Sequence, residues 1–182
     1  MRNLFNSFIV SALLCSTATI NAATIDINKA HSKVEIDVKA TGDNFTGTLN
    51  SYTAALEGNK ATKEPTKVTF EWNFANLDTG KEKRNAKMLS WLSNSTTGRF
   101  VLTSFTKRND SRMWAKGTMT INKVDQVIEF PTKVLFKGDS ATIRGAATID
   151  TTQFNLPIIK MLGFLTVDPA VKIRFTLRGV IK

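Results

Sequence analysis

The chain has 182 residues, of which 25 are lysine or arginine and 15 are aspartate or glutamate, so its formal net charge is +10. A single cysteine excludes an intrachain disulfide, and the length favours one domain with an ordinary hydrophobic core. Apart from clusters at residues 81–84 and 107–108, the cations are scattered singly along the chain, which is typical of a solvated surface and argues against a nucleic-acid partner.

The first segment, residues 1–22, has the three-part composition of a secretory signal peptide. A positive charge at Arg2 precedes an apolar run over residues 4–15, and small residues end at Ala22. The run is shorter than the roughly 20 apolar residues that a membrane-spanning helix needs. We expect cleavage after Ala22, export to the periplasm or the medium, and a mature chain of residues 23–182 that has lost Cys15.

Alternation of polar and apolar residues is the strongest pattern in the mature chain. It runs without a break through residues 33–40 and returns at 67–74 and 171–178. A period of two residues indicates half-buried strands with one wet and one dry face. Short turn segments separate the strands, so neighbours are expected to be antiparallel. Further strands are expected near residues 44–56, 99–107, 112–122, 126–137 and 141–150.

Two segments interrupt this alternation. Residues 81–92 carry apolar side chains at helical spacing, which predicts a short amphipathic helix inserted between strands. Residues 157–165 form an apolar insert that begins with Pro157, and we expect one or two helical turns there. About eight long strands that share a dry face must curl into a barrel or fold into a sandwich.

Small residues on the expected inner face favour the barrel. On two neighbouring strands, near residues 113–121 and 141–149, that face includes Ala115, Gly117 and Ala147. A barrel of about eight strands with small inward residues leaves room for one small ligand. The alternative is a closed core in which the glycines serve as bulges or bends.

Catalytic groups are sparse in the sequence. The single histidine, His31, stands next to Ser32, and adjacent residues on a strand point to opposite faces, so the two do not form a catalytic pair. We expect His31 to form a cap or hydrogen bond at the barrel end, or to contact a ligand head group. We predict neither a metal site nor an enzyme, and rank a hydrolase or isomerase on this scaffold last.

The sequence is rich in the aromatic and aliphatic side chains that bind an apolar molecule. Ligand pockets are lined mostly by hydrophobic and aromatic side chains, and each CH₂ moved from water into such a lining gains about 0.8 kcal/mol. Any one of these residues could instead belong to an ordinary core. The predicted ligand-binding residues are Phe45, Phe70, Trp72, Phe74, Phe100, Met113, Gly117, Met119, Phe130, Ala147 and Phe175.

The two inserts are expected to close or flank one mouth of the barrel. Lys83 and Arg84 lie in the first insert, and we expect them, with His31, to contact an anionic head group. Alternatively, the inserts cover the bottom of the barrel, or their apolar and basic residues touch a membrane surface transiently.

Several short motifs follow one another in the order of a known family. They are Thr24-Ile25-Asp26-Ile27-Asn28-Lys29-Ala30-His31-Ser32, Phe45-Thr46-Gly47, Leu77-Asp78-Thr79-Gly80 with Lys83-Arg84, Gly117-Thr118-Met119-Thr120-Ile121 with Val124, and Gly145-Ala146-Ala147-Thr148-Ile149-Asp150 with Phe154. Through these motifs the chain resembles the YceI-like family of polyisoprenoid-binding, lipocalin-like proteins. It departs from the family pattern at Asn85, where an acidic residue is usual, and over residues 93–98, where an aromatic-rich turn with aspartate is usual.

The resemblance implies an all-β fold, an antiparallel lipocalin-like β-barrel of about eight strands with a short helical insert. It also implies export to the periplasm and binding of a long isoprenoid or fatty chain inside the barrel. We therefore predict a monomeric or homodimeric carrier for transport of a polyisoprenoid, an isoprenoid quinone or a fatty-chain lipid, with no cofactor besides that lipid. The alternative is a ligand-free structural or interaction module that uses its basic surface and apolar inserts.

Overall fold

The computed structural model describes residues 22–92, 95–108, 112–161 and 165–182. Apart from Ala22, the predicted signal peptide lies outside these residues, so the cleavage site and the export stay predictions. No helix among the described residues is long and apolar enough to cross a membrane.

Most of the described chain forms β-strands, as the alternation predicts. The predicted helix is confirmed as α1 (Glu82–Leu92), and short 3₁₀ helices occur at η1 (Lys29–His31), η2 (Phe74–Asn76) and η3 (Thr151–Phe154). The strands of the main sheet are β1 (Ala22–Ile27), β2 (Lys33–Val38), β3 (Phe45–Leu49), β4 (Tyr52–Asn59), β5 (Pro65–Asn73), β6 (Leu77–Asp78), β7 (Thr97–Lys107), β8 (Met113–Ile121), β9 (Val124–Lys137), β10 (Ser140–Asp150) and β13 (Ala170–Ile181).

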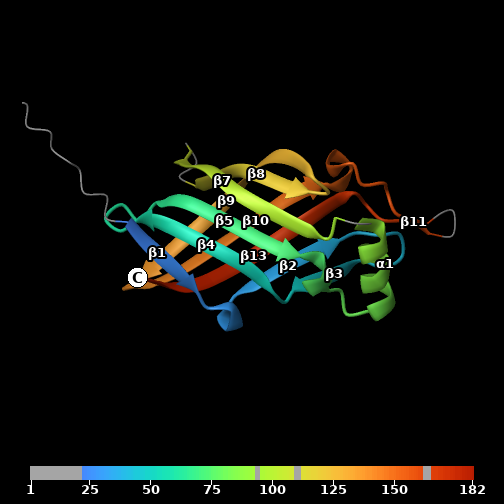
Figure 1. Cartoon of the computed structure of the whole chain (residues 1–182), viewed down its shortest axis with the longest axis horizontal. Coiled ribbons are helices and arrows are strands. Elements are labelled where there is room, and N and C mark those ends of the chain that lie inside the picture. Colours follow the sequence, from blue (N-terminus) through green and yellow to red (C-terminus); the bar gives the residue numbers. More distant parts are fainter. Residues whose placement is uncertain (1–21, 93–94, 109–111, 162–164) are drawn as a thin grey trace, which may run out of the picture.

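The main sheet closes on itself into a barrel (Figure 1). Its strand order runs β1-β4-β5-β7-β8-β9-β10-β13, and β13 then pairs with β1. All of these pairings are antiparallel, so the predicted closed antiparallel barrel of eight strands is confirmed. Closure leaves this part of the sheet without an unpaired edge that another chain could extend.

Three of the eight barrel strands are broken into two pieces. The C-terminal half of β13 pairs with β1, Ile181 opposite Ile25, and its N-terminal half pairs with β2, Phe175 opposite Val34. Strands β1 and β2 are therefore two halves of one barrel strand, separated by η1. In the same way, β3 pairs with β2 while β4 pairs with β1, so β3 and β4 are two halves of a second barrel strand. Strand β6 pairs with β3 while β5 pairs with β4, so β5 and β6 are two halves of a third.

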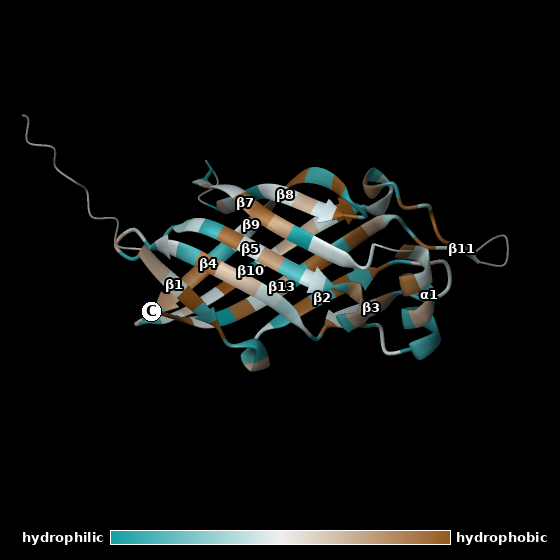
Figure 2. Cartoon of the chain, in the orientation of Figure 1, coloured by the Kyte–Doolittle hydropathy of each residue, from teal (hydrophilic) through white to brown (hydrophobic). Residues whose placement is uncertain are grey.

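Apolar side chains on the inner face form the core. Along β8 the inward residues Ala115, Met119 and Ile121 are buried, and along β10 so are Ala147 and Ile149. Figure 2 shows the corresponding alternation of hydrophobic and hydrophilic residues along the barrel strands. The dry face that the sequence pattern predicts is thus the inside of the barrel.

Glycines on this inner face seat aromatic rings. A Cβ atom at Gly117 would lie 2.4 Å from the Phe100 ring, and a Cβ atom at Gly145 would lie 2.4 Å from the Phe175 ring. These rings occupy the space that a side chain would need, so Gly117 does not provide the open room that its small size led us to expect. The sequence shows the small residue but not the large neighbour that fills its place.

The described part of the apolar insert, residues 157–161 and 165, is not helical, which corrects the sequence-based expectation; residues 162–164 lie outside the described chain. The preceding η3 ends at Asn155, whose backbone is left-handed (φ 57°). Lys160–Met161 then pairs with Leu165–Thr166 as strands β11 and β12. The Pro157 carbonyl, which could accept the first hydrogen bond of a helix, instead accepts one from the Trp91 indole nitrogen at 2.7 Å.

An ion-pair group on the barrel surface ties β2 to β13, where the barrel closes. Arg174 donates to both carboxylate oxygens of Asp37, with an Nε–Oδ2 distance of 2.6 Å and an Nη2–Oδ1 distance of 2.8 Å. Its Nη1 atom lies 3.1 Å from Oε2 of Glu35. The hydrogen bonds from Arg174 lower the pKa of Asp37 to about 2.

We expect Asp37→Asn to lower the free energy of unfolding by about 1 kcal/mol at neutral pH, allowing for the partial solvent exposure of the pair. The folded pKa lies below the ordinary 3.8, so the carboxylate stabilises the barrel at neutral pH and loses this effect as the pH falls from 3.8 through about 2. Urea unfolding across this range should show the difference between wild type and variant shrinking. A difference of constant size would contradict the ion-pair explanation.

We expect Gly117→Ala to destabilise the protein by about 1–3 kcal/mol, because its Cβ must displace the Phe100 ring or the Val101 carbonyl, each 2.4 Å away. Thr118→Ala, on the outer face of the same strand, is the control and should change stability by about 0.5 kcal/mol or less. Equal urea midpoints for the two variants would show that the glycine does not seat the ring.

Candidate functional site

Two apolar cavities lie inside the barrel. One has a volume of about 180 Å³ and extends to the β4–β5 hairpin at residues 57–65, and we call it the hairpin cavity. The other has a volume of about 690 Å³ and extends to α1 and residues 156–159, and we call it the helix cavity. Ile36, Trp72 and Ile173 line both, so the cavities adjoin each other along the barrel.

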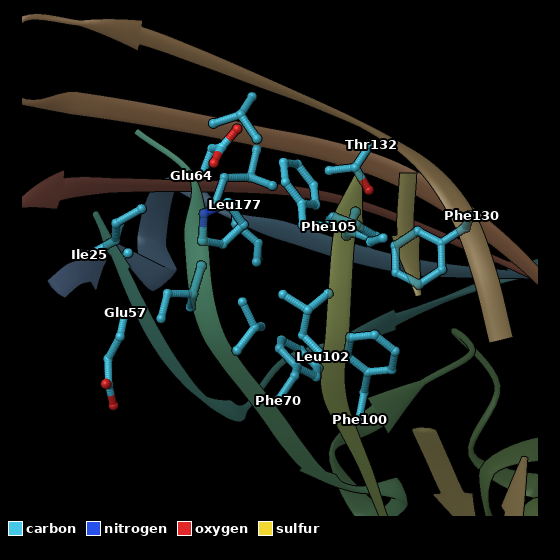
Figure 3. Close-up of a pocket in the computed structure, with 18 of the residues that line it drawn as sticks. Ile25, Glu57, Glu64, Phe70, Phe100, Leu102, Phe105, Phe130, Thr132 and Leu177 are labelled. Atoms are coloured by element: carbon cyan, nitrogen blue, oxygen red, sulfur yellow. The ribbon is translucent and has the colours of Figure 1, made fainter. Parts of the chain in front are cut away.

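The hairpin cavity is walled by inward side chains from strands all around the barrel. Strand β9 alone contributes alternate residues from Ile128 to Phe136, and β7 contributes Leu102 and Phe105. Figure 3 shows the rings of Phe70, Phe100, Phe105 and Phe130 around this space. Charged side chains enter the lining only from the hairpin segment at residues 57–65. An alkyl or isoprenoid chain could fill such a lining through apolar contact alone.

Trp72 stands where the two cavities meet. Its ring centroid lies 5.9 Å from that of Phe70 and 5.8 Å from that of Phe74. The ring rests on Gly98, where a Cβ atom would come within 2.1 Å of it. Because Phe70 lines the hairpin cavity and Phe74 the helix cavity, this row of three aromatic residues runs from one cavity into the other.

Helix α1 forms one wall of the helix cavity and is held there from both of its ends. Near its start, the Asn85 side chain accepts hydrogen bonds from the backbone nitrogen and the hydroxyl of Thr79, at 2.9 and 2.6 Å, and donates one to Asp78 at 3.1 Å. Near its end, Trp91 donates to Pro157. Asn85, at which the chain departs from the family pattern, therefore fixes the turn that leads into the helix.

Four cations from residues 81–87 line one side of the helix cavity, together with Asp43 and Asp168. Lys81 and Arg84 lie 3.0 and 3.5 Å from Oδ2 of Asp43, and the hydrogen bond from Lys81 lowers the pKa of that carboxyl group. The Arg84 guanidinium stacks 3.8 Å above the Phe45 ring. Lys83 and Lys87 also line the cavity, and the salt bridges of the described residues include neither of them. The mouth therefore presents positive charge beside an apolar interior.

The structure brings most of the predicted ligand-binding residues to these two cavities. The hairpin cavity receives Phe70, Trp72, Phe100, Met119, Phe130, Ala147 and Phe175. The helix cavity receives Phe45, Trp72 and Phe74. Met113 and Gly117 line neither one: Met113 lies at the end of β8 opposite Thr132, and Gly117 lies beneath the Phe100 ring.

The three predicted head-group residues separate into two places. Lys83 and Arg84 line the helix cavity. His31 is exposed in η1, where its backbone nitrogen donates to Asn28, and it lines neither cavity. The expected contact between His31 and a head group therefore has no support from its position.

Several lining residues were not predicted. The sequence signal was available in the alternation itself, because every second residue of β9 from Ile128 to Phe136 points inward. The alternation alone does not distinguish an inward residue that packs in a core from one that lines a cavity. The additional lining residues include Leu56, Val68, Leu102, Phe105, Ile128, Thr132, Val134, Phe136, Ile143 and Leu177.

Within the described part of the chain, no group of three or more histidine, cysteine, aspartate or glutamate residues is placed to hold a metal ion.

The chain matches one family model and is similar in fold to several solved structures. The model of the YceI-like domain matches residues 25–178. A comparison with curated proteins finds no significant match. Among solved structures, BcnA of Burkholderia cenocepacia is 21% identical, with a TM-score of 0.74 over 85% of this chain and 100% of its own.

Two further solved structures share the barrel. A polyisoprenoid-binding domain of Saccharophagus degradans, implicated in plant cell wall breakdown, is 14% identical, with a TM-score of 0.64 over 87% of this chain and 98% of its own. The YCEI protein of Campylobacter jejuni is 18% identical, with a TM-score of 0.53 over 63% of this chain and 72% of its own. At these identities the likeness shows the fold alone.

We expect Trp72→Ala to widen the passage between the two cavities and to shift the best-bound member of a series of saturated fatty acids to a longer chain. The substitution should also destabilise the protein by about 3–5 kcal/mol, because it empties a large volume inside the barrel. Competition against a fluorescent fatty acid measures the chain-length profile. Trp114→Ala is the control, since Trp114 lines neither cavity. An unchanged profile in a folded Trp72→Ala variant would contradict this role of Trp72.

Proposed function

The chain belongs to the YceI-like family, a family of ligand-binding barrels, and from this premise we propose that it is an exported carrier of a long apolar molecule. In this proposal residues 1–22 direct the chain to the periplasm and are then removed. The mature barrel takes up a polyisoprenoid, an isoprenoid quinone or a fatty-chain lipid and transports it as a monomer or homodimer.

The adjoining pair of apolar cavities is the observation that carries this proposal. The helix cavity, at about 690 Å³, lies within the range of roughly 300–1,000 Å³ that is usual for small-molecule pockets. The hairpin cavity extends the same apolar lining beyond Trp72. At about 0.8 kcal/mol for each buried CH₂ group, a chain that enters both cavities would bind tightly without a hydrogen bond.

The charge at the mouth favours one orientation of the ligand. Lys83, Arg84 and Lys87 attract an anionic head group at the α1 end, while the chain extends toward the β4–β5 hairpin. Arg84 is already held over the Phe45 ring and near Asp43, so Lys83 and Lys87 are the cations available for new ion pairs. Most side chains in the cavity walls behind them are apolar, which supports a carrier of a long apolar chain.

Exchange of lipid with a membrane surface would follow from the same geometry. Ile158, which is 45% exposed, lines the helix cavity close to the cations of α1. An apolar side chain beside positive charge is a combination that attracts anionic lipid surfaces. We propose that the helix-cavity mouth faces the membrane during transient loading and release.

Native mass spectrometry of the mature protein, purified without detergent, tests the carrier proposal. We expect a stoichiometric lipid that is released on denaturation, because the apolar lining should not stay empty in a cell. Protein that carries no lipid and takes up neither isoprenoids nor fatty acids on titration would favour the ligand-free interaction module instead.

Charge reversal tests the orientation. The double substitution Lys83→Glu and Lys87→Glu is expected to weaken binding of hexadecanoate roughly three- to tenfold, because two cations near the head group are replaced by anions. Lys116→Glu, on the outer face of β8, is the control and should leave the affinity unchanged. Equal affinities of all three proteins would place the head group elsewhere.

A further inference from the structure

The Thr132 side chain places a hydroxyl group among the apolar side chains by which β9 lines the hairpin cavity. On β9 the inward residues Ile128, Phe130, Val134 and Phe136 are apolar, and Thr132 interrupts this row. Among the described residues that line the cavity, the charged and amide side chains come from residues 57–64, and Thr132 supplies the one hydroxyl group. Figure 3 shows Thr132 extending from the barrel wall into the space that Phe105 and Phe130 also line.

This hydroxyl has no hydrogen-bond partner in the barrel. Its oxygen is buried and makes no hydrogen bond to any described residue. A buried hydroxyl that is left unsatisfied is destabilising because it has lost its hydrogen bonds to water, so such groups are rare in native interiors. Two other buried polar atoms share this state, the Tyr52 hydroxyl and the Trp114 indole nitrogen, but neither residue lines the hairpin cavity.

We propose that Thr132 is a polar subsite that recognises an uncharged oxygen, a hydroxyl or a carbonyl, on the distal part of the ligand chain. This inference rests on the proposed function, because it requires a chain that enters the hairpin cavity. The oxygen is uncharged because the rings of Phe105 and Phe130 wall this part of the cavity, and an isolated charge there would be strongly penalised. A hydroxyl accepts and donates, so Thr132 can pair with either kind of oxygen.

The ligand oxygen that meets Thr132 must lie on the part of the ligand chain remote from the head group, because Thr132 lies in the hairpin cavity. A ligand whose anionic head group meets Lys83 and Lys87 fills the helix cavity first. Its chain must pass Trp72 before it reaches Thr132. The proposed ligand class is therefore a long-chain lipid with a charged head and a second, neutral oxygen remote from it.

The test compares hexadecanoic acid with hydroxyhexadecanoic acids that carry the hydroxyl at successive carbons of the distal half. In a wholly apolar cavity every hydroxylated acid would bind more weakly than the parent acid, because its hydroxyl loses water without gaining a partner. We expect the wild type to bind at least one isomer about as tightly as hexadecanoic acid. Thr132→Val should lower the affinity for that isomer, relative to the affinity for the parent acid, about five- to tenfold.

Three further variants complete the test. Thr132→Ser retains the hydroxyl and should preserve the affinity for the hydroxylated isomer, whereas Thr132→Ala should lose it as Thr132→Val does. Thr118→Val, on the outer face of the adjacent strand β8, is the control and should change neither affinity.

Two results would overturn the inference, and they are distinguishable. If hexadecanoic acid binds but the ratio of the two affinities is the same in wild type and in Thr132→Val for every isomer, the subsite is wrong and the carrier proposal stands. If the wild type binds neither these acids nor an isoprenoid on titration, the carrier proposal and the subsite fail together.

Discussion

Closure of the sheet through β13 is the constraint on which the rest of this structure depends. The strand pairs with β10 along one side and with β1 and β2 along the other, so it joins the two ends of the meander. Closure turns one apolar face inward against itself, and the interior of a barrel of about eight strands is wide enough to hold one small ligand. The two cavities are the space that remains, and the binding role follows from them.

Aromatic rings determine the shape of that space. Phe100 and Phe175 lie on glycines of the neighbouring strands, and Trp72 lies on Gly98, so each large ring is fixed by the missing side chain beside it. This packing fills the middle of the barrel and leaves room toward its two ends. Trp72 and its neighbouring rings lie between the cationic mouth near α1 and the hairpin cavity. Thr132 supplies the one hydroxyl group among the described residues that line the hairpin cavity.

The period-two pattern predicted most of the strands, the inner face and part of the cavity lining, because a half-buried strand must alternate. It did not predict β1, although Ala23, Ile25 and Ile27 alternate with polar residues, since that run is short and adjoins the expected signal peptide. Other features depend on tertiary contacts that a single sequence does not show. The Trp91 bond to Pro157 and the ring seated on Gly117 are of this kind.

The central claim is that a single chain occupies both cavities, with its head group at the α1 mouth. A crystal structure of the mature protein with a fatty acid brominated at its terminal carbon tests this most directly, because the anomalous signal of bromine locates the chain end. We expect a bromine peak in the hairpin cavity, beyond Trp72, with the carboxylate near Lys83 and Lys87. A bromine peak in the helix cavity or at the α1 mouth would contradict it.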